Sequence, residues 1–352
     1  MIALTLFFFL TAAIGCSSQH KGPEKVKAPP GGVLLKGAGA TFPSLLYNRW
    51  FQMHQKNHGN TAISYDAVGS GEGIRRFMGR NTKEEELVDF GASDAAMKDE
   101  DIGQVKSGVV LLPATAGSVV LAYNLPDFDG ELRLSRKAYT GIFLGEITKW
   151  NDPLIVKSNP GVKLPKISIA TVVRQDSSGT TYAFTKHLDA ISEKWRSRHG
   201  PATLVNWEGN AMRAKGNEGV AGRIKQSVGS IGYVGYEFAH KLGLKLAVLE
   251  NREGRFVKPT GQTATAALST AQMPDNLRLF IPDPAGPDSY PIVTLSWILL
   301  YKGYEDRAKG KAIYDLFRWC LTDGQDFAAE LGYVRLPEGI SKKALAALDT
   351  LK

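Results

Sequence analysis

The sequence predicts an α/β protein in which strands and helices alternate along the chain. Three times, a stretch with strand-like alternation ends in a turn of small and hydroxyl residues and is followed by helical spacing. These turns lie at 37–44, 69–73 and 174–181. Repeated strand–turn–helix units indicate a largely parallel sheet covered by helices. Ligands bind at the carboxyl ends of such strands, which is where all three turns lie.

The elements follow one another in a regular order. We expect strands at 33–36, 61–68, 87–91, 167–173 and 231–234. We expect helices at 45–54, 135–144, 182–188, 220–226, 308–320 and 324–331, with another beginning at 74–78.

Two strongly apolar stretches, 109–123 and 290–300, bracket the middle of the chain. The first has the length of two short strands with a break between them. Their placement predicts that the chain leaves one domain, builds a second and returns. We expect 33–114 and 291–352 to form the first lobe and 115–290 the second. One large sheet with a long insertion is the alternative.

The N-terminus has the pattern of a lipoprotein leader. An apolar run at 4–13 is too short to span a bilayer and leads through small residues to Cys16. We expect residues 1–15 to be a signal peptide cleaved before Cys16, whose thiol carries lipid. No Lys or Arg precedes the run, so an uncleaved leader and an ordinary secretory cleavage stay open. Residues 16–32, rich in Pro and Gly, are expected to be a flexible tether.

The composition excludes several classes of protein. The net charge is +8, but the basic residues are dispersed, which favours a solvated basic surface over a nucleic-acid site. The six histidines are scattered, so we expect no metal site and no cofactor. With Cys16 lipidated, only Cys320 remains, and its surroundings predict a buried helical residue rather than a disulfide partner.

The stretch RQDSSGTTY, residues 174–182, carries the clearest binding signal. At a strand-to-helix turn the first helical N–H groups are unpaired and attract anions. Ser178 and Thr180 add hydroxyl donors, Gly179 allows close approach, and Arg174 adds a permanent positive charge. Ordinary helix capping by Ser or Thr is the alternative.

Asp94, at the end of the third predicted strand, points to selectivity. An ionised carboxylate only accepts hydrogen bonds, so it suits an oxyanion that carries a proton and repels one that does not. Capping of the next turn is the alternative. Asp176 is expected to orient Arg174, and it can also cap the helix that follows.

Six segments together resemble the phosphate-binding proteins of bacterial high-affinity phosphate ABC transporters. They occur in the right order and run through most of the chain: GAGATFP (37–43), GSGEG (69–73), DFGASD (89–94), LGEITKWNDP (144–153), RQDSSGTT (174–181) and KGNEGV (215–220). The uncharged leader and a longer loop at 81–86 depart from the pattern. The longer loop is expected to leave the site intact.

The resemblance implies a two-lobed periplasmic-binding-protein fold of type II. Each lobe is then a mixed sheet flanked by helices, two hinge crossings join the lobes, and phosphate is clamped between them. In the first lobe Thr41 and Phe42 are expected to bind phosphate through backbone N–H groups, and Thr41 also through its hydroxyl. Ser70 offers its hydroxyl and N–H, and Asp94 accepts the phosphate proton.

In the second lobe the resemblance assigns the charge and the remaining donors. Arg174 pairs with phosphate oxygens, and Asp176 holds its guanidinium. Ser178, Gly179 and Thr180 are expected to offer N–H groups, with the hydroxyls of the serine and threonine.

The expected function is an extracytoplasmic receptor, in the periplasm or at the cell surface, that delivers phosphate to a membrane ABC permease. We expect a lipid anchor, no nucleic-acid partner and no catalysis, since the chain lacks a phosphate-binding P-loop, a G-x-S-x-G nucleophile turn and a metal cluster. Three alternatives stay open: an enzyme acting on phosphate esters, a receptor for another oxyanion such as sulfate, and a phosphate sensor without a role in transport.

Overall fold

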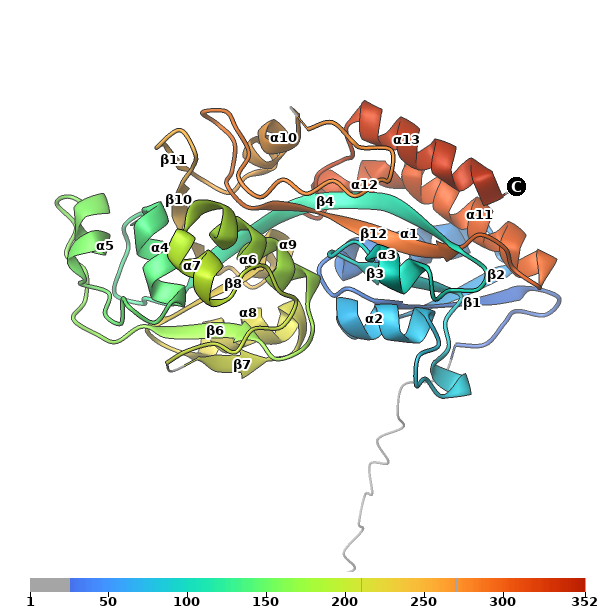
Figure 1. Ribbon diagram of the computed structural model, residues 1–352, viewed down its shortest axis with the longest axis horizontal. Coiled ribbons are helices and arrows are strands. Elements are labelled where there is room, and N and C mark those ends of the chain that lie inside the picture. Colours follow the sequence, from blue (N-terminus) through green and yellow to red (C-terminus); the bar gives the residue numbers. More distant parts are fainter. Residues whose placement is uncertain (1–25, 210, 270, 352) are drawn as a thin grey trace, which may run out of the picture.

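A computed structural model describes residues 26–209, 211–269 and 271–351. These residues form a mixed α/β structure whose main sheet curls through two lobes covered by helices (Figure 1). The predicted α/β class is confirmed. The expected signal peptide and Cys16 lie outside the described residues, as does most of the expected tether.

The first part of the chain forms strand–helix units of the predicted kind. Its elements are β1 (Val33–Gly39), α1 (Ser44–Asn57), β2 (Thr61–Ala67), α2 (Ser70–Phe77), the short 3-10 helix η1 (Glu84–Glu86), β3 (Phe90–Ser93) and α3 (Asp99–Ile102). Strand β1 runs parallel to β2 on one side and to β3 on the other. The polar turns after these strands therefore meet at one edge of the sheet.

One long strand, β4 (Val109–Tyr123), joins the two halves of the main sheet (Figure 1). Up to Ser118 it pairs with β12 (Val293–Tyr301), and from Val119 onward it pairs with β8 (Ser230–Gly235). All of its residues are buried. The two lobes therefore share a strand whose partner changes in the middle.

The predicted break within this apolar stretch is wrong. The strand continues past Pro113, which pairs with Trp297, because the pairing register shifts between Ser296 and Trp297. The residue without an N–H therefore stands at an irregularity of the ladder. The predicted lobe boundaries at 114/115 and 290/291 stay predictions. The partner change on β4 and the start of β12 lie close to them.

The middle of the chain forms the second lobe. Its elements are β5 (Arg133–Leu134), α4 (Arg136–Phe143), α5 (Pro153–Ser158), β6 (Ala170–Arg174), α6 (Gly179–Ile191), α7 (Glu193–Arg198), β7 (Met212–Ala214), α8 (Gly216–Gln226), β8, α9 (Tyr236–Lys241), β9 (Lys245–Leu246), β10 (Val248–Glu250), β11 (Phe256–Val257) and α10 (Gly261–Ser269). Strand β6 is parallel to β7 and β8, so the turns after these strands also share an edge.

The chain returns through β12 to the first lobe and ends in helices. These are α11 (Arg307–Leu321), the 3-10 helix η2 (Asp323–Asp326), α12 (Phe327–Glu330), α13 (Glu338–Leu348) and the 3-10 helix η3 (Asp349–Leu351). Helix α13 packs on β4 and α11 (Figure 1). It was not among the expected helices, although Ile340, Ala344 and Leu348 mark its buried face at helical spacing. Cys320 is buried and free on α11, as expected.

The main sheet has the strand order β2-β1-β3-β12-β4-β8-β6-β7, with β9 on the far part of β4. A small sheet of β11, β10 and β5 lies apart from it. Within the described ranges, no helix combines the length and apolar character needed to cross a bilayer. In that same part of the chain no His, Cys, Asp and Glu side chains gather as metal ligands.

The side chain of Gln325 ties the C-terminal helices to the shared strand. Its amide nitrogen donates to the carbonyls of Ala114 (3.0 Å) and Cys320 (2.9 Å), and its amide oxygen accepts from the N–H of Leu336 (3.1 Å). The residue is 2% exposed, so water cannot replace these bonds.

We expect Gln325→Ala to lower the free energy of unfolding by about 2–4 kcal/mol, because it leaves buried backbone groups unpaired. Chemical denaturation of the purified protein measures this loss. Gln272→Ala, at an exposed position, is the control and is expected to change little. A loss for Gln325→Ala as small as that of the control would contradict the assignment.

Candidate functional site

The turn after β1 places Thr41 and Phe42 at the junction of the lobes. The hydroxyl oxygen of Thr41 accepts hydrogen bonds from the backbone N–H of Asn217 (3.1 Å) and from its side-chain amide (2.9 Å). The carbonyl of Phe42 accepts from the hydroxyl of Tyr333 at 2.7 Å, and the phenylalanine ring is buried. Thr41 thus contacts the second lobe, while Phe42 is held from within the first.

Ser70, the first residue of α2, joins the two lobes directly. Its hydroxyl oxygen accepts from the N–H of Asp94 at 3.2 Å and from the N–H of Gly179 at 3.0 Å. The N–H of Gly71 donates to the carbonyl of Ser177 at 3.1 Å. The bonds from Gly179 to Ser70 and from Gly71 to Ser177 cross the cleft, so the structure has the lobes closed.

Asp94 is a buried carboxyl facing Arg174 and Thr180. The hydroxyl of Ser296, on β12, donates to its Oδ1 at 2.8 Å. Burial raises the pKa of Asp94 to about 7, although the bond from Ser296, the charge of Arg174 and the hydroxyl of Thr180 all lower it. In the described part of the chain no backbone N–H of the following turn donates to this carboxyl, which argues against the capping alternative.

Arg174 ends β6 and is 2% exposed. Its Nε donates to Oδ1 of Asp176 at 2.9 Å, and a second guanidinium nitrogen donates to the other carboxylate oxygen, which makes the pair bidentate. Burial works against the charge of Asp176, but Arg174 and the N–H of Gly216 outweigh it and hold the pKa of this carboxyl below its ordinary value. The guanidinium is thereby fixed in one orientation.

Helix α6 begins at Gly179, with Ser178 as its capping residue. The hydroxyl oxygen of Ser178 accepts from the N–H of Thr181 at 3.1 Å. Helix capping, the alternative for this motif, is therefore confirmed at Ser178. The expectation that Asp176 could also cap this helix is wrong, because Ser178 occupies the capping position. Capping uses only a lone pair, so the hydroxyl proton remains available to a ligand. The hydroxyl of Thr180 accepts from Arg174 at 3.4 Å.

The residues predicted to bind phosphate or to orient Arg174 meet in this one region, from both sides of the cleft. They come from four turns and are Thr41, Phe42, Ser70, Asp94, Arg174, Asp176, Ser178, Gly179 and Thr180. The predicted lipidation site, Cys16, lies outside the described residues. The region combines neutral donors, one oriented guanidinium and one buried carboxyl. Such a set has the chemistry to bind a small oxyanion that carries a proton.

Sequence reasoning missed three residues that hold this region together. Asn217 donates to the hydroxyls of both Thr41 and Thr180, and Ser296 donates to Asp94. Tyr233 accepts the N–H of Arg174 at 3.2 Å. Asn217 lies inside the segment KGNEGV, which was noted without a role. A serine inside a long apolar strand was the only sign of Ser296.

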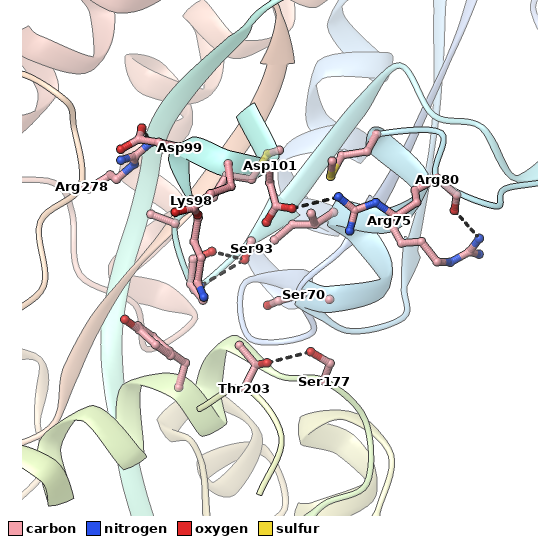
Figure 2. Close-up of a pocket in the computed structure, with 18 of the residues that line it drawn as sticks. Ser70, Arg75, Arg80, Ser93, Lys98, Asp99, Asp101, Ser177, Thr203 and Arg278 are labelled. Atoms are coloured by element: carbon pink, nitrogen blue, oxygen red, sulfur yellow. Dashed lines mark hydrogen bonds and ion pairs between the residues drawn. The ribbon is translucent and has the colours of Figure 1, made fainter. Parts of the chain in front are cut away.

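A cavity of about 560 Å³ lies beside these residues at the mouth of the cleft. Figure 2 shows Ser70 and Ser93 on one wall and Ser177 with Thr203 on the other. Arg278 and Lys98 also line it, together with acidic residues of α3. The cavity has a mixed lining, with apolar side chains such as Ile74, Met97 and Phe280 beside these polar groups.

Comparison with known proteins assigns the chain to a family. The family model of the PBP superfamily domain matches residues 20–314. A phosphate-binding protein PstS of Pasteurella multocida is 38% identical over 319 residues, covering 90% of this chain and 90% of that protein. The chain belongs to the PstS family of phosphate-binding proteins. Another member, from Methanocaldococcus jannaschii, is 34% identical over 377 residues and covers 100% of this chain and 95% of its own.

Solved structures share the fold of this PstS family member. A high-affinity periplasmic phosphate-binding protein (PfluDING) bound with phosphate superposes with a TM-score of 0.74 at 20% identity, over 89% of this chain and 93% of that one. A phosphate-binding protein from Stenotrophomonas maltophilia has a TM-score of 0.72 at 19% identity, with the same coverage. The predicted two-lobed fold is confirmed.

Gly179 offers a test of closure that leaves each lobe intact. A Cβ atom there would lie 2.5 Å from Cβ of Asp94 and 2.7 Å from its backbone N, on the opposite lobe. We expect Gly179→Ala to hold the lobes apart, because the contact is with backbone and cannot be relieved by a rotamer change. Alanine favours a helix, so the free energy of unfolding of the ligand-free protein is expected to stay within about 1 kcal/mol.

Small-angle X-ray scattering with and without inorganic phosphate measures this effect. The wild type is expected to contract when phosphate is added, and Gly179→Ala is expected to contract less. Gly222→Ala, in α8 with open space around the new methyl group, is the control and should behave as the wild type. Full contraction of Gly179→Ala would show that this contact does not limit closure.

Proposed function

We propose that this protein captures inorganic phosphate between its two lobes and delivers it to a membrane ABC permease. One observation carries the proposal: the hydroxyl of Ser70 on the first lobe binds the N–H of Gly179 on the second, directly beside Asp94 and Arg174. The donors and the selective carboxyl are thus brought together only when the lobes close. Membership in the PstS family supports the same ligand.

The proposed ligand contacts follow from the chemistry of each group. Arg174, held by Asp176, faces the negative charge of phosphate with a fixed pair of donors. Thr41, Ser70 and Thr180 offer hydroxyls, and the first turn of α6 offers backbone N–H groups. Because most of these donors are neutral, they bind the anion without requiring that each of its charges be paired.

Asp94 is the proposed selectivity residue, and its pKa gives the selectivity a pH dependence. With a pKa near 7, the carboxyl and the phosphate share one proton around neutral pH, and a hydrogen bond joins them whichever oxygen holds it. Sulfate brings no proton. Above about pH 7 an ionised Asp94 repels sulfate, and below it the protonated carboxyl donates a hydrogen bond to sulfate.

We propose that no chemical step accompanies binding. In the described part of the chain, the hydroxyl oxygens of Ser70 and Ser178 accept backbone N–H groups, and no histidine is hydrogen-bonded to either. A serine nucleophile needs such a base. The arrangement therefore favours a receptor over an enzyme acting on phosphate esters.

The lipid anchor and the location outside the cytoplasm remain part of the proposal. They depend on the leader and Cys16, which lie outside the described residues, and on the apolar run that precedes the cysteine. In this proposal a lipid at Cys16 keeps the receptor near a membrane permease, and residues 16–32 act as a linker that lets the receptor reorient.

Calorimetric titration with phosphate and sulfate tests the ligand and the role of Asp94. The wild type is expected to bind phosphate and to reject sulfate at about pH 8, with rejection weakening towards about pH 6 as the carboxyl is protonated. Asp94→Asn is expected to keep phosphate binding and to reduce the discrimination by about tenfold or more, since the amide both donates and accepts.

Asp127→Asn is the matched control, because Asp127 is exposed in the loop between β4 and β5. It is expected to discriminate as the wild type does. Sulfate binding to the wild type at about pH 8 as tight as phosphate binding would reject the ligand assignment. Unchanged rejection of sulfate by Asp94→Asn would reject the role of the carboxyl.

We expect Cys16→Ser to release the protein from membranes when the full chain is expressed in a bacterial host. Cell fractionation and immunoblotting measure the distribution, with wild type in the membrane fraction and the variant in the soluble one. Cys320→Ser, at the buried cysteine, is the control and should stay with the membrane. A wild type found free of membranes would refute the anchor.

A further inference from the structure

The turn after β8 places a second carboxyl at the junction of the lobes. Glu237 is the second residue of α9, and it is 3% exposed. In the described part of the chain neither of its carboxyl oxygens has a hydrogen-bond partner. A buried carboxyl without donors strongly disfavours its charged form.

The backbone is shaped to hold this carboxyl. A Cβ atom on Gly235 would lie 2.1 Å from Oε1 of Glu237. Gly235 has φ −60° and ψ 137°, which any residue can adopt, so the glycine is needed for space rather than for conformation. The N–H of Gly235 donates to Oδ1 of Asn217 at 2.9 Å, and the amide of Asn217 binds Thr41 and Thr180. The carboxyl therefore lies beside the bonds that hold the lobes together.

The groups that face Glu237 come from the first lobe. They are the carboxyl of Asp94 and the hydroxyl of Tyr333, and neither is a cation. Tyr333 donates its one proton to the carbonyl of Phe42 at 2.7 Å, so it has none left for the carboxyl. A protonated Glu237 can instead donate to the oxygen of Tyr333. On the same helix, His240 stacks with the ring of Tyr236, with 5.6 Å between the ring centres.

These surroundings favour the neutral carboxyl in the closed lobes. Burial raises the pKa of Glu237 well above its ordinary value of 4.5, and the charge of Asp94 raises it further, while the residue's own backbone lowers it less. In water the same carboxyl is ionised at neutral pH. The charge state of Glu237 therefore depends on whether this junction is closed.

We propose that Glu237 couples closure of the lobes to the uptake of one proton from solvent. Strand β4 changes partners at Val119, which pairs with Gly235, so Glu237 lies just beyond the shared strand on the second lobe. Asp94 and Tyr333 belong to the first lobe. Rotation that opens the cleft separates Glu237 from them and hydrates it, whereupon it loses its proton. Closure around phosphate reverses these steps, so this inference rests on the proposed function.

The sign of the effect follows from proton linkage. At a pH between the ordinary pKa of a glutamate and the raised pKa in the closed lobes, closing binds one proton. The contribution of Glu237 to phosphate affinity is therefore complete at low pH and is lost as the pH rises through this window, by up to about tenfold per pH unit. Opening releases the proton, so alkaline conditions favour phosphate release.

Calorimetry in buffers of different ionisation enthalpy counts the protons taken up with phosphate. Wild type and Glu237→Gln are compared between about pH 5 and 8, because glutamine has the shape of the neutral carboxyl but cannot ionise. The wild type is expected to take up as much as one more proton per phosphate, and its affinity is expected to fall more steeply with pH. Protons that belong to phosphate and to Asp94 cancel in the difference.

Glu218→Gln, exposed on α8, is the control and should match the wild type. Gly235→Ala is a second variant that displaces the carboxyl without removing it, and it is expected to lose the extra proton uptake. Phosphate binding with equal proton uptake in wild type and Glu237→Gln overturns this inference alone, as does full uptake by Gly235→Ala. A wild type that does not bind phosphate overturns both this inference and the proposed function.

Discussion

The shared strand β4 is the constraint on which the rest of the structure depends. Its backbone is hydrogen-bonded to β12 up to Ser118 and to β8 from Val119, so the two lobes are joined through one continuous strand. The least costly relative motion is rotation where the partner changes, because few ladder bonds are disturbed there. The turns that end β1, β3 and β6 face each other across this axis. Neither lobe therefore holds a complete binding region.

The ionisable side chains around that axis carry little net charge. Arg174 is neutralised by Asp176 through two hydrogen bonds, which keeps a buried guanidinium tolerable and oriented. Asp94 and Glu237 face the same junction from opposite lobes, and burial favours their neutral forms. Two carboxyls in one dry region cannot both ionise without a large cost, so closure and proton binding are linked. In the roles proposed for Asp94 and Glu237, selectivity and release therefore both depend on pH.

Sequence reasoning worked where the signal was local. The strand-to-helix turn at Ser178 and the carboxyl at Asp94 stand out because small, hydroxyl and charged residues interrupt apolar periodicity at strand ends. It failed where partners are distant. Ser296 lies 202 positions from the carboxyl to which it donates, and nothing near it in sequence marks that role. The pattern also does not reveal that β4 continues through Pro113, since a proline is tolerated in a strand where the pairing register shifts.

The sequence by itself determined the fold class, the family and the chemistry of each turn, because these depend on residue types within a few positions of one another. Tertiary structure alone decided which turns face each other, that Asn217 ties Thr41 to Thr180, and that Gly235 leaves room for the carboxyl of Glu237. Those facts depend on how two separately formed halves pack along β4. Packing sets burial, and burial determines whether a carboxyl near the cleft is charged or holds a proton.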